Sequence, residues 1–300
     1  MSKLSKLTLL AAASALLPFA AQAQVIKIDG SSTVYPITEG VAEDFQKLKK
    51  NAIKVTVGIS GTGGGFKKFC RGETDIQDAS RPILDKEMND CRAAGVEYIE
   101  LPVAFDALTV VMNPKNAFLK SITVDELKKM WEPAAQGKIL RWNQVNPAWP
   151  DAPIKLFGAG SDSGTFDYFT EAINGKSKAS RGDFTASEDD NVLVQGVAQD
   201  VNAIGYFGYA YFEAEKGRLK AIAIDGVAPS KETVDSGKYP LARPLFLYST
   251  QKVMKEKPQV SGYINFYLQR VNDAFKRVAY FPAPAAELTT AKQNWINAMK

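Results

Sequence analysis

The sequence predicts an α/β fold with a largely parallel sheet. In four places a short strand-like run is followed by a cluster that is mostly Ser, Thr and Gly. The apolar residues after each cluster generally recur at helical spacing, so the hydrophobic period changes from two to about 3.6. Strands that alternate with helices in this way indicate an α/β fold, in which ligands bind beyond the carboxyl ends of the strands.

The first two units follow this pattern closely. Their expected strands are residues 25–28 and 53–59, the second with strict apolar and polar alternation. The polar turns after these strands cover residues 29–33 and 60–65. The apolar positions that indicate the two helices are Val41, Phe45 and Leu48, then Phe66, Phe69 and Cys70.

The third and fourth units are shorter versions of the same pattern. Their expected strands are residues 75–79 and 154–157, followed by the clusters 80–82 and 161–165. Pro82 suits the first turn of a helix, where its missing N–H is not needed. The apolar faces of the two helices are Leu84, Met88 and Cys91, then Phe166, Phe169 and Ile173.

The start of the chain has the form of a signal peptide. Lys3 and Lys6 precede an apolar run over residues 7–20 and a small-x-small site over 21–23. We expect cleavage after Ala23 and an exported, soluble periplasmic protein, because the run is too short to span a membrane and no cysteine near the site offers a lipid anchor.

Composition excludes several classes of function. The formal charge of +4 falls to +2 without Lys3 and Lys6, which is too balanced to predict nucleic acid or a membrane surface as a partner. The chain has no histidine, so most hydrolase and metalloenzyme mechanisms lack their usual base or ligand, and we expect no metal or cofactor. Cys70 and Cys91 are the only cysteines, and export favours a disulfide between them over two buried thiols.

The four clusters have the chemistry of an anion site. A helix N-terminus offers free N–H groups and a positive dipole end, and hydroxyls and glycines there allow close contact with a small oxyanion. Each cluster taken alone is better explained as helix capping, but four together favour anion binding. Arg81 would add a guanidinium that matches a tetrahedral oxyanion, although an arginine that covers a helix start is the alternative.

Five segments in order along the mature chain carry a family resemblance: DGSSTVYP (29–36), SGTGGGF (60–66), DIQDASRPI (75–83), GSDSGTFDYF (160–169) and AIGYFGY (203–209). With them the sequence resembles the periplasmic phosphate-binding proteins of high-affinity phosphate ABC transporters. The resemblance implies a Venus-flytrap fold, in which two α/β domains joined by two strand crossovers close on phosphate. It also implies a membrane permease as partner and no enzymatic activity.

The resemblance, together with the clusters, predicts the groups that contact phosphate. They are Ser32, Thr33, the Val34 N–H, Ser60, Thr62, Ser80, Arg81, Ser161, Ser163, Gly164 and Thr165. Two positions depart from the family pattern: Ala159 stands where an arginine is usual, and Arg81 where an aspartate is usual. We therefore expect another carboxylate to accept the proton of hydrogen phosphate and to disfavour sulfate, and Asp106, at the start of the apolar strand 108–112, is the candidate. The alternative for Asp106 is a turn residue that caps a strand end.

We expect domain one to comprise residues 24–106 and 246–300, and domain two residues 107–245, with residues 244–247 as the returning crossover. We also expect a monomer. Two other functions stay open. The same scaffold could bind sulfate, molybdate or another oxyanion, and a phosphoesterase with Ser163 or Thr165 as nucleophile is the more distant alternative, since no histidine is present to activate it.

Overall fold

The computed structural model describes residues 24–275 and 280–300. The predicted signal peptide and its cleavage site lie outside these described residues. Across both described ranges, no helix is long and apolar enough to cross a membrane.

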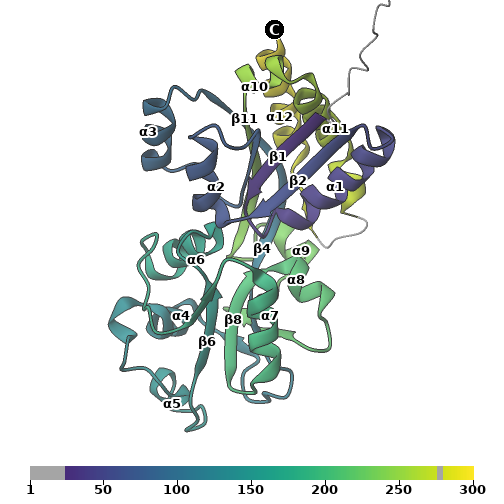
Figure 1. Ribbon diagram of the computed structural model, residues 1–300. Coiled ribbons are helices and arrows are strands. Elements are labelled where there is room, and N and C mark those ends of the chain that lie inside the picture. Colours follow the sequence, from purple (N-terminus) through teal and green to yellow (C-terminus); the bar gives the residue numbers. More distant parts are fainter. Residues whose placement is uncertain (1–23, 276–279) are drawn as a thin grey trace, which may run out of the picture.

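Two lobes lie one above the other and are joined by long strands (Figure 1). The strands of lobe one are β1 (Gln24–Gly30), β2 (Ile53–Ile59) and β3 (Ile76–Ala79). Those of lobe two are β6 (Lys155–Ala159), β7 (Thr185–Ser187) and β8 (Ala203–Gly208). The joining strands are β4 (Tyr98–Met112) and β11 (Ala242–Thr250).

One sheet runs through both lobes in the order β2-β1-β3-β11-β4-β8-β6-β7. Pairing is parallel within each lobe, between β1 and its two neighbours and between β6 and its two neighbours. It is antiparallel where β11 meets β3 and β4 and where β4 meets β8. The predicted α/β fold is thus confirmed, and its parallel character belongs to each lobe separately.

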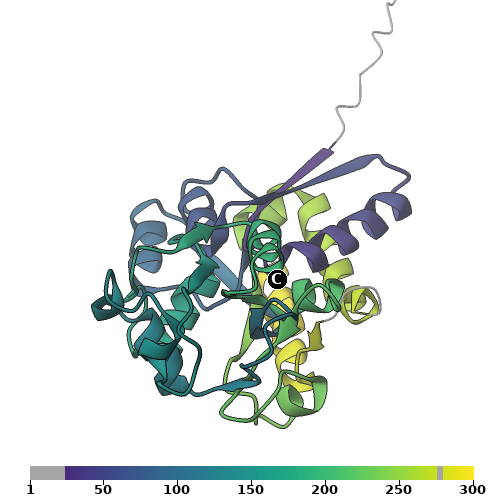
Figure 2. The ribbon, with the colours of Figure 1, turned by 90° about the horizontal axis from the view of Figure 1, so that it is seen from below.

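Helices cover the sheet in both lobes (Figures 1 and 2). Lobe one has α1 (Tyr35–Leu48), α2 (Gly61–Phe69), α3 (Asp85–Ala93), α10 (Gln251–Glu256), α11 (Pro258–Ala274) and α12 (Ala285–Met299). Lobe two has α4 (Val124–Trp131), the 3-10 turn η1 (Pro133–Ala135), α5 (Trp142–Val145), α6 (Gly164–Asn174), α7 (Asp190–Gln199), α8 (Tyr209–Ala214) and α9 (Lys231–Asp235). The short strands are β5 (Ser121–Ile122), β9 (Lys220–Ala221), β10 (Ala223–Ile224) and β12 (Phe281–Pro282).

Each lobe has its own hydrophobic core. In lobe one, Phe45 of α1 lies with its ring centroid 5.3 Å from that of Tyr263 on α11. In lobe two, Phe169 of α6 stacks on Tyr206 of β8 with centroids 3.8 Å apart. The cores divide close to the predicted domain boundaries, although Ala210 packs with the lobe one core and Phe281 with that of lobe two. The boundaries themselves remain a prediction.

Several expected details differ in the structure. The glycine-rich cluster after β2 is not a separate turn, because α2 already begins at Gly61. Pro82 precedes α3, which begins at Asp85. Leu48 is 61% exposed because it is the last residue of α1 rather than part of its buried face. Asp106 is neither at the start of a strand nor in a turn, since the pairing of β4 with β11 extends that strand back to Tyr98.

The disulfide predicted between Cys70 and Cys91 is confirmed. It joins the residue after α2 to α3, and both sulfur-bearing residues are buried. A crosslink that closes a loop of this size stabilises the fold by roughly 3 kcal/mol on the chain-entropy model.

Candidate anion-binding site

The hydroxyl-bearing helix starts of the two lobes meet at the junction between them. In lobe one, the turn from β1 to α1 places Thr33, the first turn of α2 places Thr62, and the end of β3 places Ser80. In lobe two, the start of α6 places Thr165. All four side chains are buried. A serine hydroxyl stabilises the turn before each of these two threonines. The Thr33 N–H donates to the Ser31 Oγ, and the Thr165 N–H donates to the Ser163 Oγ.

The hydroxyls contact each other directly. The Oγ1 atoms of Thr33 and Thr165 are 3.2 Å apart across the junction, and the Thr62 Oγ1 is 3.2 Å from the Ser80 Oγ. Gly164 lies against the second pair: a Cβ atom there would be 2.5 Å from the Thr62 Oγ1 and 2.6 Å from the Ser80 Oγ. Only glycine therefore permits this approach of the lobes.

A buried arginine lies beside the Thr33 and Thr165 pair. Arg243 of β11 is 1% exposed, and its Nη2 donates to the Oγ1 atoms of Thr33 and Thr165 over 3.1 and 2.8 Å. Its Nη1 is buried and has no hydrogen-bond partner among the described residues. The guanidinium thus presents a free donor in a nest of hydroxyls, as a bound oxyanion requires.

Asp106 is the counter-ion of Arg243. Its Oδ2 lies 3.1 Å from the Nη2 and 3.3 Å from the Nε of that arginine, and its Oδ1 accepts from the Tyr209 N–H over 3.1 Å. The carboxylate is fully buried. The structure therefore places this predicted site residue at the junction, but with an arginine as its partner.

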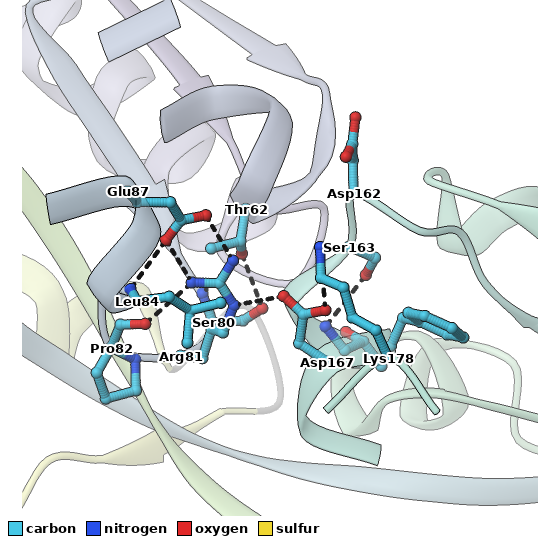
Figure 3. A network of polar contacts seen from close by, with 12 residues as sticks. Thr62, Ser80, Arg81, Pro82, Leu84, Glu87, Asp162, Ser163, Asp167 and Lys178 are labelled. Atoms are coloured by element: carbon cyan, nitrogen blue, oxygen red, sulfur yellow. Dashed lines mark hydrogen bonds and ion pairs between the residues drawn. The ribbon is translucent and has the colours of Figure 1, made fainter. Parts of the chain in front are cut away.

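Arg81 is held by carboxylates from both lobes (Figure 3). Its Nη1 and Nη2 donate to Glu87 of α3 over 2.8 and 2.7 Å, and its Nε donates to Asp167 of α6 over 2.6 Å. Arg81 is 5% exposed. Burial raises the pKa of Asp167, while the charges of Arg81 and Lys178 oppose that rise. The contact between Arg81 and Asp167 is an ion pair that joins the lobes.

The remaining predicted residues divide into two groups. Ser32 and Val34 are buried in the turn before α1, where the Val34 N–H donates to the Ser31 carbonyl. Ser60 donates to Asp29 of the same lobe. Ser161 is exposed, and its carbonyl accepts from the Nζ of Lys178 over 3.3 Å.

A second acid at the junction was not predicted. Asp190, the first residue of α7, is 1% exposed and accepts from the Ser32 Oγ over 3.4 Å. Burial raises its pKa to about 7, and the charge of Arg243 partly offsets the rise. Two sequence signals could have found these missed residues: Arg243 stands alone in an apolar strand, and Asp190 begins a helix in tandem with another aspartate.

Main-chain and surface contacts also link the lobes. The Gly63 N–H of α2 donates to the Asp162 carbonyl over 2.8 Å. At the more exposed edge, the Lys67 Nζ lies 2.8 Å from both carboxylate oxygens of Asp162. The Tyr211 hydroxyl donates to the Ser32 carbonyl over 2.9 Å. The two lobes are therefore in contact, and the hydroxyl cluster is enclosed between them.

Comparison with known proteins identifies the scaffold. The PBP superfamily domain matches residues 18–271. The chain belongs to the PBP superfamily. It is 54% identical over 266 residues to Protein SphX of Synechocystis, covering 87% of this chain and 79% of that protein. It is 36% identical over 271 residues to the phosphate-binding protein PstS of Staphylococcus saprophyticus, covering 88% of this chain and 82% of the relative.

One solved structure that resembles this chain contains bound phosphate. The putative phosphate ABC transporter substrate-binding protein of Clostridium perfringens, solved with bound phosphate, is 25% identical to this chain with a TM-score of 0.74. The match covers 87% of this chain and all of that one (100%). No group of three or more acidic or cysteine residues that could hold a metal occurs in the described part of the chain.

Proposed function

We propose that this PBP superfamily member captures inorganic phosphate between its lobes and delivers it to the permease of an ABC transporter. The observation that carries the proposal is the unpartnered, buried Nη1 of Arg243 within a ring of hydroxyls from both lobes. The relatives that are named phosphate-binding proteins support the same ligand.

The chemistry of the junction suits a small, dehydrated oxyanion. Thr33 and Thr165 bring hydroxyl donors from opposite lobes, and Thr62 and Ser80 add a second pair. Hydroxyls and one guanidinium can replace the hydration shell of phosphate without a metal ion. Because the donors come from both lobes, the anion would stabilise the form in which the lobes touch.

In this proposal the predicted Arg81 and the unpredicted Arg243 have different tasks. Arg243 contacts the anion, whereas Arg81 holds the lobes together through Asp167. Ser32, Thr33, Thr62, Ser80, Ser163, Gly164 and Thr165 form the cradle, while Ser60 and Ser161 are directed elsewhere. This assignment moves the positive charge from the β3 end predicted from the sequence to the returning crossover.

The two alternatives are weaker on chemical grounds. A phosphoesterase needs a base beside its nucleophile, but the Thr165 hydroxyl lies 2.8 Å from a guanidinium that cannot accept a proton. The Ser163 Oγ accepts from the Thr165 N–H as a helix cap. Binding of sulfate or molybdate is compatible with the site if no carboxylate is needed to accept a proton from the anion. Export to the periplasm, a monomeric state and the permease partner belong to the same proposal.

Calorimetric titration of the mature chain with phosphate, sulfate and molybdate tests the proposal. We expect one phosphate per chain and markedly weaker binding of the other two anions. Tighter binding of sulfate or molybdate than of phosphate would identify another oxyanion as the cargo. Release of product from a chromogenic phosphate ester would instead support the phosphoesterase.

A further inference from the structure

Asp190 has a buried carboxylate oxygen that the protein leaves without a partner. The Oδ1 accepts from Ser32, but the Oδ2 forms no hydrogen bond with any residue in the described ranges. A buried acceptor without a donor costs about 1 to 3 kcal/mol. In a binding junction such an atom indicates a donor that the ligand brings.

Asp190 and the free donor of Arg243 belong to one cluster. Ser32, which donates to Asp190, adjoins Thr33, whose Oγ1 accepts from Arg243. The charge of Arg243 also lowers the pKa of Asp190 against the effect of burial. Gly208 lies close to two groups that contact Arg243, namely Thr33 and Asp106. A Cβ atom at Gly208 would be 3.2 Å from the Thr33 Cγ2 and 3.4 Å from the Asp106 Oδ2. The main-chain N–H of Gly208 lies near the Asp190 carboxylate and lowers its pKa, but it forms no hydrogen bond with the Oδ2. The cluster therefore offers one unfilled acceptor and one unfilled donor.

Hydrogen phosphate matches this pair of unfilled groups. Its deprotonated oxygens accept from a guanidinium, and its remaining O–H donates to a carboxylate. Sulfate lacks that proton, so it would place an oxygen lone pair against the Asp190 carboxylate, and two negatively charged acceptors would face each other with no proton between them.

Asp106, the acid predicted from the sequence, is already engaged. Its Oδ2 faces two N–H groups of Arg243 and its Oδ1 accepts from the Tyr209 N–H. Its position is that of a counter-ion which orients the arginine. We propose that Asp190 is the carboxylate that accepts the proton of bound hydrogen phosphate and thereby disfavours sulfate, a proposal that rests on the proposed function.

The position of Asp190 ties selectivity to closure of the lobes. Asp190 belongs to α7 in lobe two, but the hydroxyl that holds its Oδ1 is Ser32 of lobe one. The acceptor is therefore completed only when the lobes touch. An anion without a proton would meet the unfavourable carboxylate at the closing step rather than at first contact.

The test is the ratio of phosphate to sulfate affinity in Asp190→Asn, measured by calorimetry at pH 8. The amide donates to a deprotonated oxygen, so we expect the ratio to shift toward sulfate on the order of 10- to 100-fold. Asp189→Asn is the matched control, since Asp189 caps the same helix by accepting from the Asn191 N–H and an asparagine caps equally well. Its ratio should equal that of the parent.

Two results would overturn the assignment: an unchanged ratio in Asp190→Asn, or a shift confined to Asp106→Asn. Asp190→Ser provides a second variant without a carboxylate if the asparagine chain does not fold. Thermal unfolding of each variant checks the fold. A parent chain that does not bind phosphate at all would contradict the proposed function, which is a separate outcome from an unchanged ratio.

Discussion

Two buried arginines lie at the junction of the lobes, and their partners differ. Arg81 donates to carboxylates of Glu87 and Asp167, one from each lobe. Arg243 faces one carboxylate, two threonine hydroxyls and a direction with no protein partner among the described residues. An arginine whose three nitrogens all have protein partners, as in Arg81, can hold a structure together but has few donors left for a ligand. The number of guanidinium nitrogens without a protein partner, rather than burial or charge, distinguishes an arginine that can bind a ligand from one that only links the lobes.

The largest expected effect comes from removing the charge of Arg243. In Arg243→Met, phosphate affinity should fall by about 4 kcal/mol, because a buried charged donor is lost and Asp106 is left unpaired. Calorimetry measures the loss. Arg243→Lys is the control: it keeps the charge but not the planar fork, so its loss should be smaller. A parent-like affinity in Arg243→Met would return the binding role to Arg81.

A smaller effect is expected from the ion pair between Arg81 and Asp167. Asp167→Asn should weaken phosphate binding by about 1 to 2 kcal/mol by destabilising the closed form, with no change in the ratio of phosphate to sulfate. Arg81→Gln should have a similar effect, and the double variant should lose little more than either single one. Calorimetry on the three chains gives the cycle. If Arg81 contacts the anion, Arg81→Gln will cost far more than Asp167→Asn.

The last expected effect is on stability and leaves phosphate binding untouched, and it concerns an acid whose pKa neither arginine lowers. Asp78 of β3 is fully buried, and burial raises its pKa to about 8, with Thr38 opposing and Asp29 adding to the rise. The folded chain keeps this proton between about pH 4 and pH 8, where the unfolded chain loses it. The free energy of unfolding should therefore decrease as pH rises through that window.

Urea unfolding at pH 5 and pH 7 checks the sign. The parent should lose roughly 1 to 3 kcal/mol more between these pH values than Asp78→Asn, whose amide does not titrate. Asp75→Asn is a control close by in the chain, because Asp75 precedes β3 and already pairs with Lys257 over 2.7 Å. An identical pH dependence in the parent and Asp78→Asn would mean that Asp78 is ionised in the fold.

The sequence predicted the fold and the hydroxyl cradle, because both depend on local patterns. Alternation, turns and helical spacing give the four strand-to-helix units, and Thr33, Thr62, Ser80 and Thr165 do meet at the junction. Charged groups were harder to place. Both Arg81 and Arg243 are isolated arginines near a cluster or crossover, and only the three-dimensional partners Glu87 and Asp167 distinguish them. Asp190 was missed because its partner Ser32 lies 158 residues away in the sequence.

The main-chain hydrogen bond from Gly63 to Asp162 has a consequence for how such proteins diverge. It joins the lobes through peptide groups, so its strength does not depend on which side chains surround the anion. Mutations that alter the cargo can accumulate in the cradle while this link persists. A lineage could in that way exchange one oxyanion for another without changing how its lobes meet.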